Sequence, residues 1–188
     1  MLLVGAVAAG ARPTLDERYR LERLEKGIDV TYANLGRRHT PFRPELLRGT
    51  TPATADYLTH LVYFLDLLVV LRADAVTTLE SGRPPHQWFG VEPVVRVRLE
   101  GLKPPPALAP VQTLLLQALT DQEAFFHDWA HRPGTPLDLE AAAVRRGHER
   151  LVRAYDTLIA NLPPQEVVVL EGLYDPFHAF DFLGVTPP

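Results

Sequence analysis

The chain has 188 residues and a formal charge of −4, from 19 lysines and arginines against 23 aspartates and glutamates. Its 46% hydrophobic and 22% charged residues are typical of a globular protein and exclude a disordered chain. The absence of cysteine excludes a disulfide framework, a thiolate zinc site, an iron–sulfur cluster and a cysteine nucleophile. Histidine, aspartate and glutamate are therefore the metal ligands that remain.

The length indicates one domain over 1–188. The charge and the apolar windows further predict that this domain binds neither nucleic acid nor a membrane. No basic run is longer than an Arg-Arg pair, whereas a nucleic-acid surface is normally basic. The most apolar window, 61–71, is shorter than the roughly 20 residues that span a bilayer. The apolar start, 1–11, lacks a basic segment, so we expect a packed extension rather than a signal peptide, and a cytoplasmic protein.

Two helices are predicted in the first half of the chain. The run from Thr14 to Glu17 has the pattern of a capping box, and an apolar stripe continues to Leu35, where Gly36 closes it. This predicts a first helix over about 15–35. Thr51 before Pro52 and the pair Ser81-Gly82 bound a second helix over about 52–81.

Two more helices are predicted in the second half. An apolar face that ends at Pro133-Gly134 indicates a third helix over about 108–132. Thr135 and Asp138 then provide a cap for a new helix, and this fourth helix is expected over about 136–162. The turn between these two helices is so short that it makes them antiparallel.

The segments between and after these helices complete the predicted fold. The linker 82–106 contains six prolines and an alternating run, 95–99, that indicates an extended edge segment. A linker of this length leaves open whether the second and third helices are parallel or antiparallel. The apolar and aromatic tail, 165–188, is expected to pack across the bundle as a short helix or strand. The fold class is therefore all-α, a four-helix bundle with a long crossover between helices 2 and 3 and a packed C-terminal tail.

Helical phase separates the histidines. His60 and His148 share faces with apolar neighbours and are expected to point inward, whereas Glu123, His127 and His131 form a row on the side away from the apolar stripe. That row has ligand spacing but also suits a polar surface near a helix end. If the second and third helices are parallel, His60 lies at the level of His148; otherwise it is nearer to His127 and His131.

The second and fourth predicted helices resemble those of the DinB/YfiT-like family. The run 51–62 resembles the family's second helix, in which a histidine followed by leucine, here His60-Leu61, supplies the first metal ligand. The run 135–151 resembles its last helix, where one ligand matches His148 and another histidine follows four residues later. Val152 occupies that position here, so the three-histidine site is incomplete. The sequence identifies no replacement ligand, although His178 would be a candidate if the tail folded back.

The resemblance implies a four-helix bundle, often dimeric, with a divalent metal (Zn, Ni, Mn or Fe) held by His60 and His148. It further implies a metal-dependent thiol transferase or a related stress-response enzyme. In that reaction the metal would lower the pKa of a bound small thiol and so generate the nucleophile. The catalytic residues stay unassigned.

Two alternatives remain open. The order of His127-Asp128, His148 and His178 resembles the HD phosphohydrolases, in which adjacent His and Asp ligate a metal that activates water. The other alternative is a dimeric binding module without catalysis that uses the apolar surface 61–71. Asp66 interrupts that surface; it needs a partner such as an arginine if buried, or reaches water at a helix edge.

Overall fold

The structure, a computed structural model, describes residues 14–181, and all regular structure within them is helical. The expected extension 1–11 and the last seven residues of the tail lie outside these described residues. In chain order the elements are α1 (Leu15–Glu25), α2 (Ile28–Asn34), η1 (Pro44–Leu46), α3 (Pro52–Glu80), α4 (His86–Glu100), η2 (Pro106–Leu108), α5 (Ala109–Ala130), α6 (Ala142–Ala160) and α7 (Val167–Phe180).

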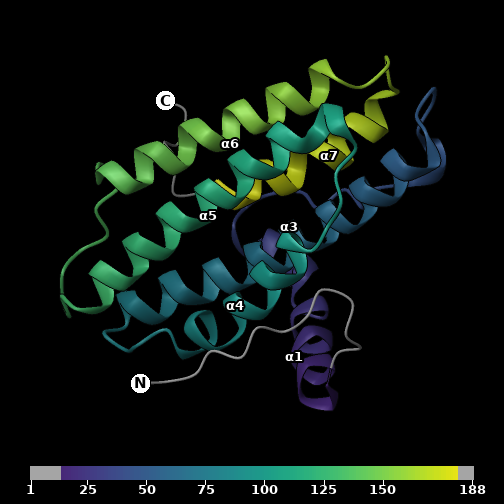
Figure 1. The fold of residues 1–188 in the computed structure, drawn as a ribbon. Coiled ribbons are helices and arrows are strands. Elements are labelled where there is room, and N and C mark those ends of the chain that lie inside the picture. Colours follow the sequence, from purple (N-terminus) through teal and green to yellow (C-terminus); the bar gives the residue numbers. More distant parts are fainter. Residues whose placement is uncertain (1–13, 182–188) are drawn as a thin grey trace.

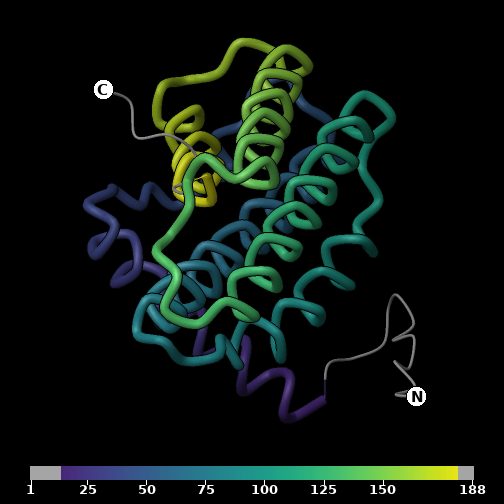
Figure 2. The backbone as a smooth tube through the Cα atoms, turned by 90° about the vertical axis from the view of Figure 1, so that its left-hand side faces the viewer, coloured from purple at the N-terminus to yellow at the C-terminus, as the bar shows by residue number. Residues whose placement is uncertain are grey.

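The helices pack as two antiparallel pairs with α7 between them. Figure 1 shows α3 and α5 running in one direction and α4 and α6 in the other. The pairs α3–α4 and α5–α6 make the closest helix contacts, and α7 packs against both α3 and α6. Figure 2 shows the turn between α3 and α4 on the side that faces the viewer. The second and third predicted helices are thus parallel, because α4 returns the chain.

Helix α3 is the centre of the core. Between Leu61 and Leu71 every residue is buried except the half-buried Tyr63. It contacts α1, α2, α4, α5 and α7, so neighbours cover it on nearly all sides. The expectation that 61–71 is an exposed surface for a dimer is therefore wrong, since helices of the same chain bury it.

Several predicted helix ends are confirmed. The Thr14 hydroxyl accepts a hydrogen bond from the Glu17 backbone N–H, and the Thr14 N–H donates to the Glu17 carboxylate, which completes the capping box. Thr51 caps α3 ahead of Pro52. Gly36 and Gly82 follow α2 and α3 with φ of 65° and 72°, the left-handed conformation that favours glycine after a helix.

The first predicted helix is wrong in one respect, because it breaks into α1 and α2 at Gly27. The Gly27 backbone N–H donates to the Leu24 carbonyl at 2.8 Å, which closes a tight turn. A Cβ at Gly27 would lie 3.3 Å from Val70 on α3, so glycine permits the close approach. Leu24 before the break and Tyr32 after it are both buried in the core.

The extended run predicted in the linker is also wrong. Residues 86–100 form α4, with Pro93 inside it. Val91, Val95 and Leu99 recur every four residues and are all buried, so the helical period determines the structure of a segment whose alternation suggested a strand.

The fourth helix begins later than expected, at Ala142 rather than near residue 136. The Trp129 indole N–H donates to the Thr135 carbonyl at 2.8 Å and ties the turn to α5. The Asp138 carboxylate accepts from the Glu140 N–H at 3.0 Å. Asp138 therefore caps a local turn rather than the helix.

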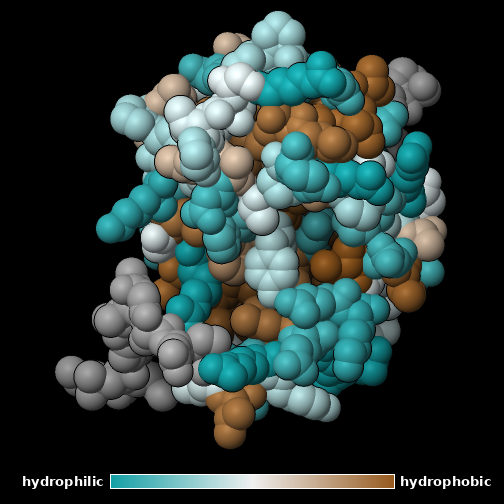
Figure 3. Space-filling view, turned by 90° about the vertical axis from the view of Figure 1, so that its right-hand side faces the viewer, coloured by the Kyte–Doolittle hydropathy of each residue, from teal (hydrophilic) through white to brown (hydrophobic). Residues whose placement is uncertain are grey.

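The part of the chain that the structure describes contains no helix with the length and apolarity to cross a membrane. Figure 3 shows one face on which hydrophilic side chains predominate and the apolar atoms are largely recessed between them.

Helix α7 lies very close to the loop that follows α2. A Cβ at Gly172 would lie 3.1 Å from the Cα of Phe42 and 3.3 Å from the carbonyl of Pro41. Because both neighbours are backbone atoms, a side chain there requires the loop or the helix to move.

We expect Gly172→Ala to lower the free energy of unfolding by roughly 1–2 kcal/mol, since overpacking outweighs the gain in helix propensity. The control is Gly90→Ala in α4, where nothing lies within 4 Å of the new Cβ. That variant should be neutral or stabilised by up to about 1 kcal/mol. Urea unfolding measures both, and equal effects would contradict the close packing of α7.

Candidate functional site

His60 lies on the surface, so the expectation that it points inward is wrong. Its side chain is 51% exposed, and Nδ1 lies 2.9 Å from the carbonyl oxygen of Asp56. Asp56 and Thr59 are exposed beside it. His60 therefore lies on an exposed face of the first turns of α3.

His148 is half-buried and belongs to a group that we call the Asp181 cluster: Arg72, His148, His178 and Asp181. Nδ1 of His148 lies 2.6 Å from Oδ2 of Asp181 at the end of α7. Burial raises the pKa of Asp181, although Arg72 and His148 oppose that shift. Burial has the opposite effect on His178, whose pKa it lowers.

Arg72 brings a charge into the core at this cluster. Its side chain is among the largest that are fully buried, and its guanidinium lies 5.4 Å from the ring centre of Phe180. Burial lowers the pKa of Arg72 to about 9, and the Asp181 carboxylate works against this. The end of α7 thus places the Asp181 carboxylate near the buried guanidinium of Arg72 on α3.

The structure does not bring His60 and His148 together. His148 lies with Asp181 near Arg72, and Arg72 follows His60 by about three helical turns along α3. Val152, where the resembled family has its next histidine, is 42% exposed. Within residues 14–181 no group of three or more His, Asp or Glu side chains has the arrangement to hold a metal ion. The metal role of His60 and His148 stays a prediction.

The row Glu123, His127 and His131 lies at the surface, as expected. The two histidines are exposed with ring centres 4.4 Å apart, and Nδ1 of His131 lies 2.7 Å from the His127 carbonyl. Glu123 pairs instead with Arg96 at 3.0 Å. The adjacent Asp128 carboxylate, which the HD resemblance matches, is also exposed.

A second polar group, the Asp66 cluster, joins α2, α3 and the loop after α2 through Asp29, Tyr32, His39 and Asp66, of which only Asp29 is exposed. The Tyr32 hydroxyl donates to Asp66 at 2.6 Å, and Nε2 of His39 lies 3.4 Å from the other oxygen of that carboxylate. Nδ1 of His39 lies 2.7 Å from Asp29. Asp66 therefore has a tyrosine and a histidine as partners rather than the expected arginine or water.

His39 is charged in this setting. The hydrogen bond to Asp66 raises its pKa to about 9, and the hydrogen bond to Asp29 acts in the same direction against burial. Both ring nitrogens then donate, so neither is available as a base. Burial and Asp66 also raise the pKa of Tyr32, which keeps its hydroxyl protonated.

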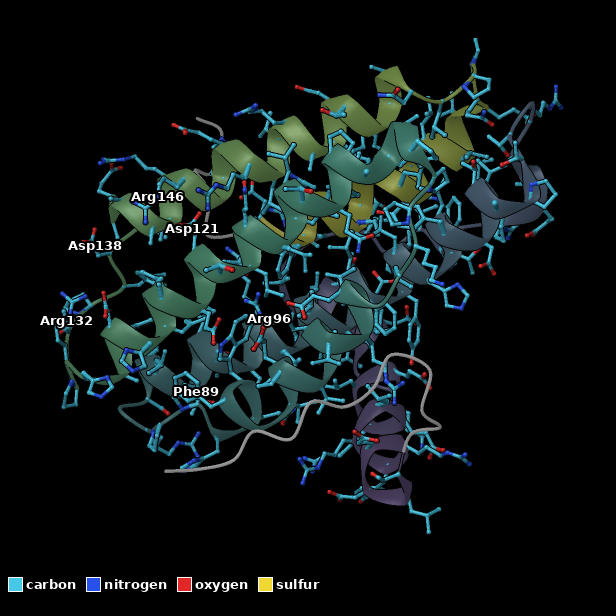
Figure 4. All side chains as sticks on the ribbon, in the orientation of Figure 1. Phe89, Arg96, Asp121, Arg132, Asp138 and Arg146 are labelled. Atoms are coloured by element: carbon cyan, nitrogen blue, oxygen red, sulfur yellow. The ribbon has the colours of Figure 1, made fainter. Side chains whose placement is uncertain are left out.

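Charged bridges also join α4, α5 and α6. Figure 4 shows Asp121 of α5 and Arg146 of α6 pointing toward one another, and Arg96 of α4 lying toward α5. Asp121 is bound by Arg146 at 3.1 Å and by Arg150. Burial raises the pKa of Glu92 to about 7, although Arg96 lies only 3.0 Å away. These groups pair with one another and stabilise the helix contacts.

A cleft opens between α2, the last turns of α3 and the start of α4. It consists of two adjoining hollows of about 360 and 340 Å³ that share Asp74 and Gln87. The first hollow is lined by Thr31, Asn34, Leu35, Val70, Ala73, Val76 and Thr77 as well, and the second by Thr78, Arg83, Pro84 and His86.

Asp74 differs from the other carboxylates that are buried or half-buried. Burial raises its pKa, and Arg23 and Arg83 act in the opposite direction from a distance. Among the described residues it has no hydrogen bond and no ion pair within 4 Å. Every other such carboxylate in 14–181 has at least one: Glu17, Asp66, Glu92, Asp121, Glu123, Glu171, Asp175 and Asp181.

Sequence reasoning did not single out the cleft. Asp74 lies on the second predicted helix and His86 in the predicted linker, and nothing in the local pattern links them to residues 31–35. No model of a known protein family, no curated protein and no solved structure matches this chain.

We expect the pH dependence of stability to report the Asp66 cluster. The folded protein holds the His39 proton up to a pKa of about 9, whereas the ordinary value is 6.5. The contribution of His39 is therefore complete below pH 6.5 and is lost as the pH rises to about 9, by roughly 2–3 kcal/mol. Urea unfolding at pH 6, 7.5 and 9 measures the slope.

His39→Gln should remove most of that slope, because the amide does not titrate. His60→Gln replaces an exposed imidazole and should leave the slope unchanged. A slope that persists in His39→Gln would contradict the charged state assigned to His39.

Proposed function

We propose that this chain is a small-molecule-binding protein, that the cleft between α2, α3 and α4 is its site, and that Asp74 binds a positively charged group of the ligand. The observation that carries the proposal is the half-buried Asp74 carboxylate without a partner among the described residues. A carboxylate that has lost part of its hydration without gaining a partner raises the free energy of the protein. A bound ammonium group removes that cost.

The remaining walls of the cleft suit such a ligand. Asn34 and Gln87 offer amide groups that make no hydrogen bond to other described residues. Leu35, Val70 and Val76 offer apolar contact on the same side. Ligand pockets typically combine apolar walls with polar groups in a hollow of this size, and this hollow has both apolar and polar side chains in its lining.

The probe for this proposal is 3-methylbutylamine, an aliphatic amine with one positive charge. Titration followed by amide chemical shifts should give saturable changes at cleft residues, and Asp74→Asn should weaken the affinity at least about tenfold. The isosteric, neutral amide should not impair folding, since it replaces a desolvated charge.

The matched control is Asp56→Asn, an exposed aspartate on the same helix. It should bind the amine as the wild type does. An amine that shifts no cleft amide, or binds equally to Asp74→Asn, would contradict the proposal.

The DinB/YfiT-like bundle and its metal-dependent thiol chemistry are the second candidate. In this proposal α1–α2, α3, α5 and α6 correspond to the four bundle helices, and the shared direction of α3 and α5 supports it. Asp181 holds Nδ1 of His148, the kind of contact that orients a metal-ligating histidine through its other nitrogen. The described residues do not supply the remaining ligands, so no reaction step is assigned to a metal. The homodimer, the small-thiol substrate and the cytoplasmic location stay predictions.

Zinc titration tests the second candidate. It requires one equivalent of Zn²⁺ to bind the wild type by calorimetry, with loss of binding in His148→Ala and in His60→Ala. His127→Ala, which removes an exposed imidazole, should keep it. A wild type that binds no more Zn²⁺ than His148→Ala would contradict a metal site at this histidine.

A further inference from the structure

The cleft presents a positive charge as well as a negative one. Arg83 lines the same hollow as Asp74, and the two side chains interact electrostatically without forming an ion pair within 4 Å. Opposite charges that face one hollow from separate positions leave room for a ligand group between them. A ligand that carries both charges complements such a pair better than a simple amine does.

The backbone fixes where Arg83 lies. Its N–H donates to the Thr78 carbonyl at 3.0 Å, and the N–H of Gly82 donates to the Leu79 carbonyl at 2.9 Å. These two bonds form the Schellman motif that closes α3, with Gly82 in the left-handed conformation. Arg83 is thus held beside Thr78, which is one helical turn beyond Asp74.

The guanidinium is oriented as well. Nε of Arg83 donates to Oγ of Ser81 at 2.9 Å, which leaves the two terminal nitrogens for another acceptor. A planar guanidinium whose two terminal nitrogens are free binds a carboxylate through them in a bidentate manner. Because Arg83 is held at a residue about one helical turn from Asp74, the pair suits a ligand whose two charged groups are close neighbours.

The apolar part of the cleft lies on the other side of Asp74. Val70 and Ala73 precede Asp74 on α3, and Leu35 faces them from the end of α2. A ligand bound by Asp74 and Arg83 would direct its third substituent along this wall. Aliphatic side chains fit it, because its lining offers no charge other than Asp74.

We propose that the ligand of the cleft is a free α-amino acid with an aliphatic side chain, whose ammonium group binds Asp74 and whose carboxylate binds Arg83. This inference rests on the proposed function and names the ligand class for the same site. Two charge-assisted contacts in place of one make the amino acid the tighter ligand of two with the same side chain.

Three compounds that share one side chain separate the charges. L-Leucine carries both, 3-methylbutylamine lacks the carboxylate, and 4-methylpentanoate lacks the ammonium group. On the wild type we expect leucine to bind about tenfold more tightly than the amine, and the acid to bind least. Calorimetry and amide shifts measure all three.

Arg83→Gln should lower the affinity for leucine to that for the amine and leave the affinity for the amine unchanged. Asp74→Asn should weaken the binding of both. Arg145→Gln, on an exposed arginine of α6, is the matched control and should change neither.

The two proposals fail in different ways. Equal affinities for leucine and the amine, both insensitive to Arg83→Gln, would overturn the amino-acid assignment and leave Asp74 as a cation site. If neither compound shifts the cleft amides, the proposed function itself is overturned.

Discussion

The arrangement of the elements around α3 depends on two ionisable side chains that this helix buries in the core. Asp66 and Arg72 are both buried on a helix that neighbours cover on nearly every side. Burying an ionised side chain costs several kcal/mol unless partners replace its hydration. Each charge therefore requires a second element at a fixed place, and this requirement positions the elements around α3.

The partners come from opposite ends of the chain. Tyr32 and His39 bring α2 and its following loop to Asp66. Asp181 and the ring of Phe180 bring the end of α7 to Arg72. The loop and α7 then meet each other, where the Thr40 N–H donates to Asp175 at 3.0 Å. Polar contacts thus set the positions of elements that apolar packing alone leaves free to slide.

The sequence predicts helices well where their signals are local. The capping box at Thr14 and the Thr51-Pro52 start involve residues within one turn, and the structure has both. The break at Gly27 and the late start of α6 depend on contacts with Val70 and Trp129, which no local pattern contains. Errors therefore fall where tertiary contacts override the local preference.

The candidate site was harder to predict for the same reason. His60 and His148 both have apolar neighbours at helical spacing, yet only His148 has a partner from another helix that holds its ring. His60 projects from the exposed face of α3, although Leu58 and Leu61 beside it are buried. Helical phase thus predicts which residues share a face but not whether that face is covered.

The carboxylates that have partners differ from Asp74, the carboxylate of the proposed ligand site. Asp66, Asp121 and Asp181 are each held by donors from another helix or loop, so their charges are already neutralised and hold the helices together. Asp74 lies on the same helix as Asp66, two turns further on, where α2 has ended and α4 has only begun. There the carboxylate is half-buried and lines a hollow together with Arg83, without a hydrogen-bond partner among the described residues. Because the fold pairs the other buried and half-buried carboxylates of residues 14–181 from within, a ligand that paired with Asp74 would stabilise the protein where its own residues do not.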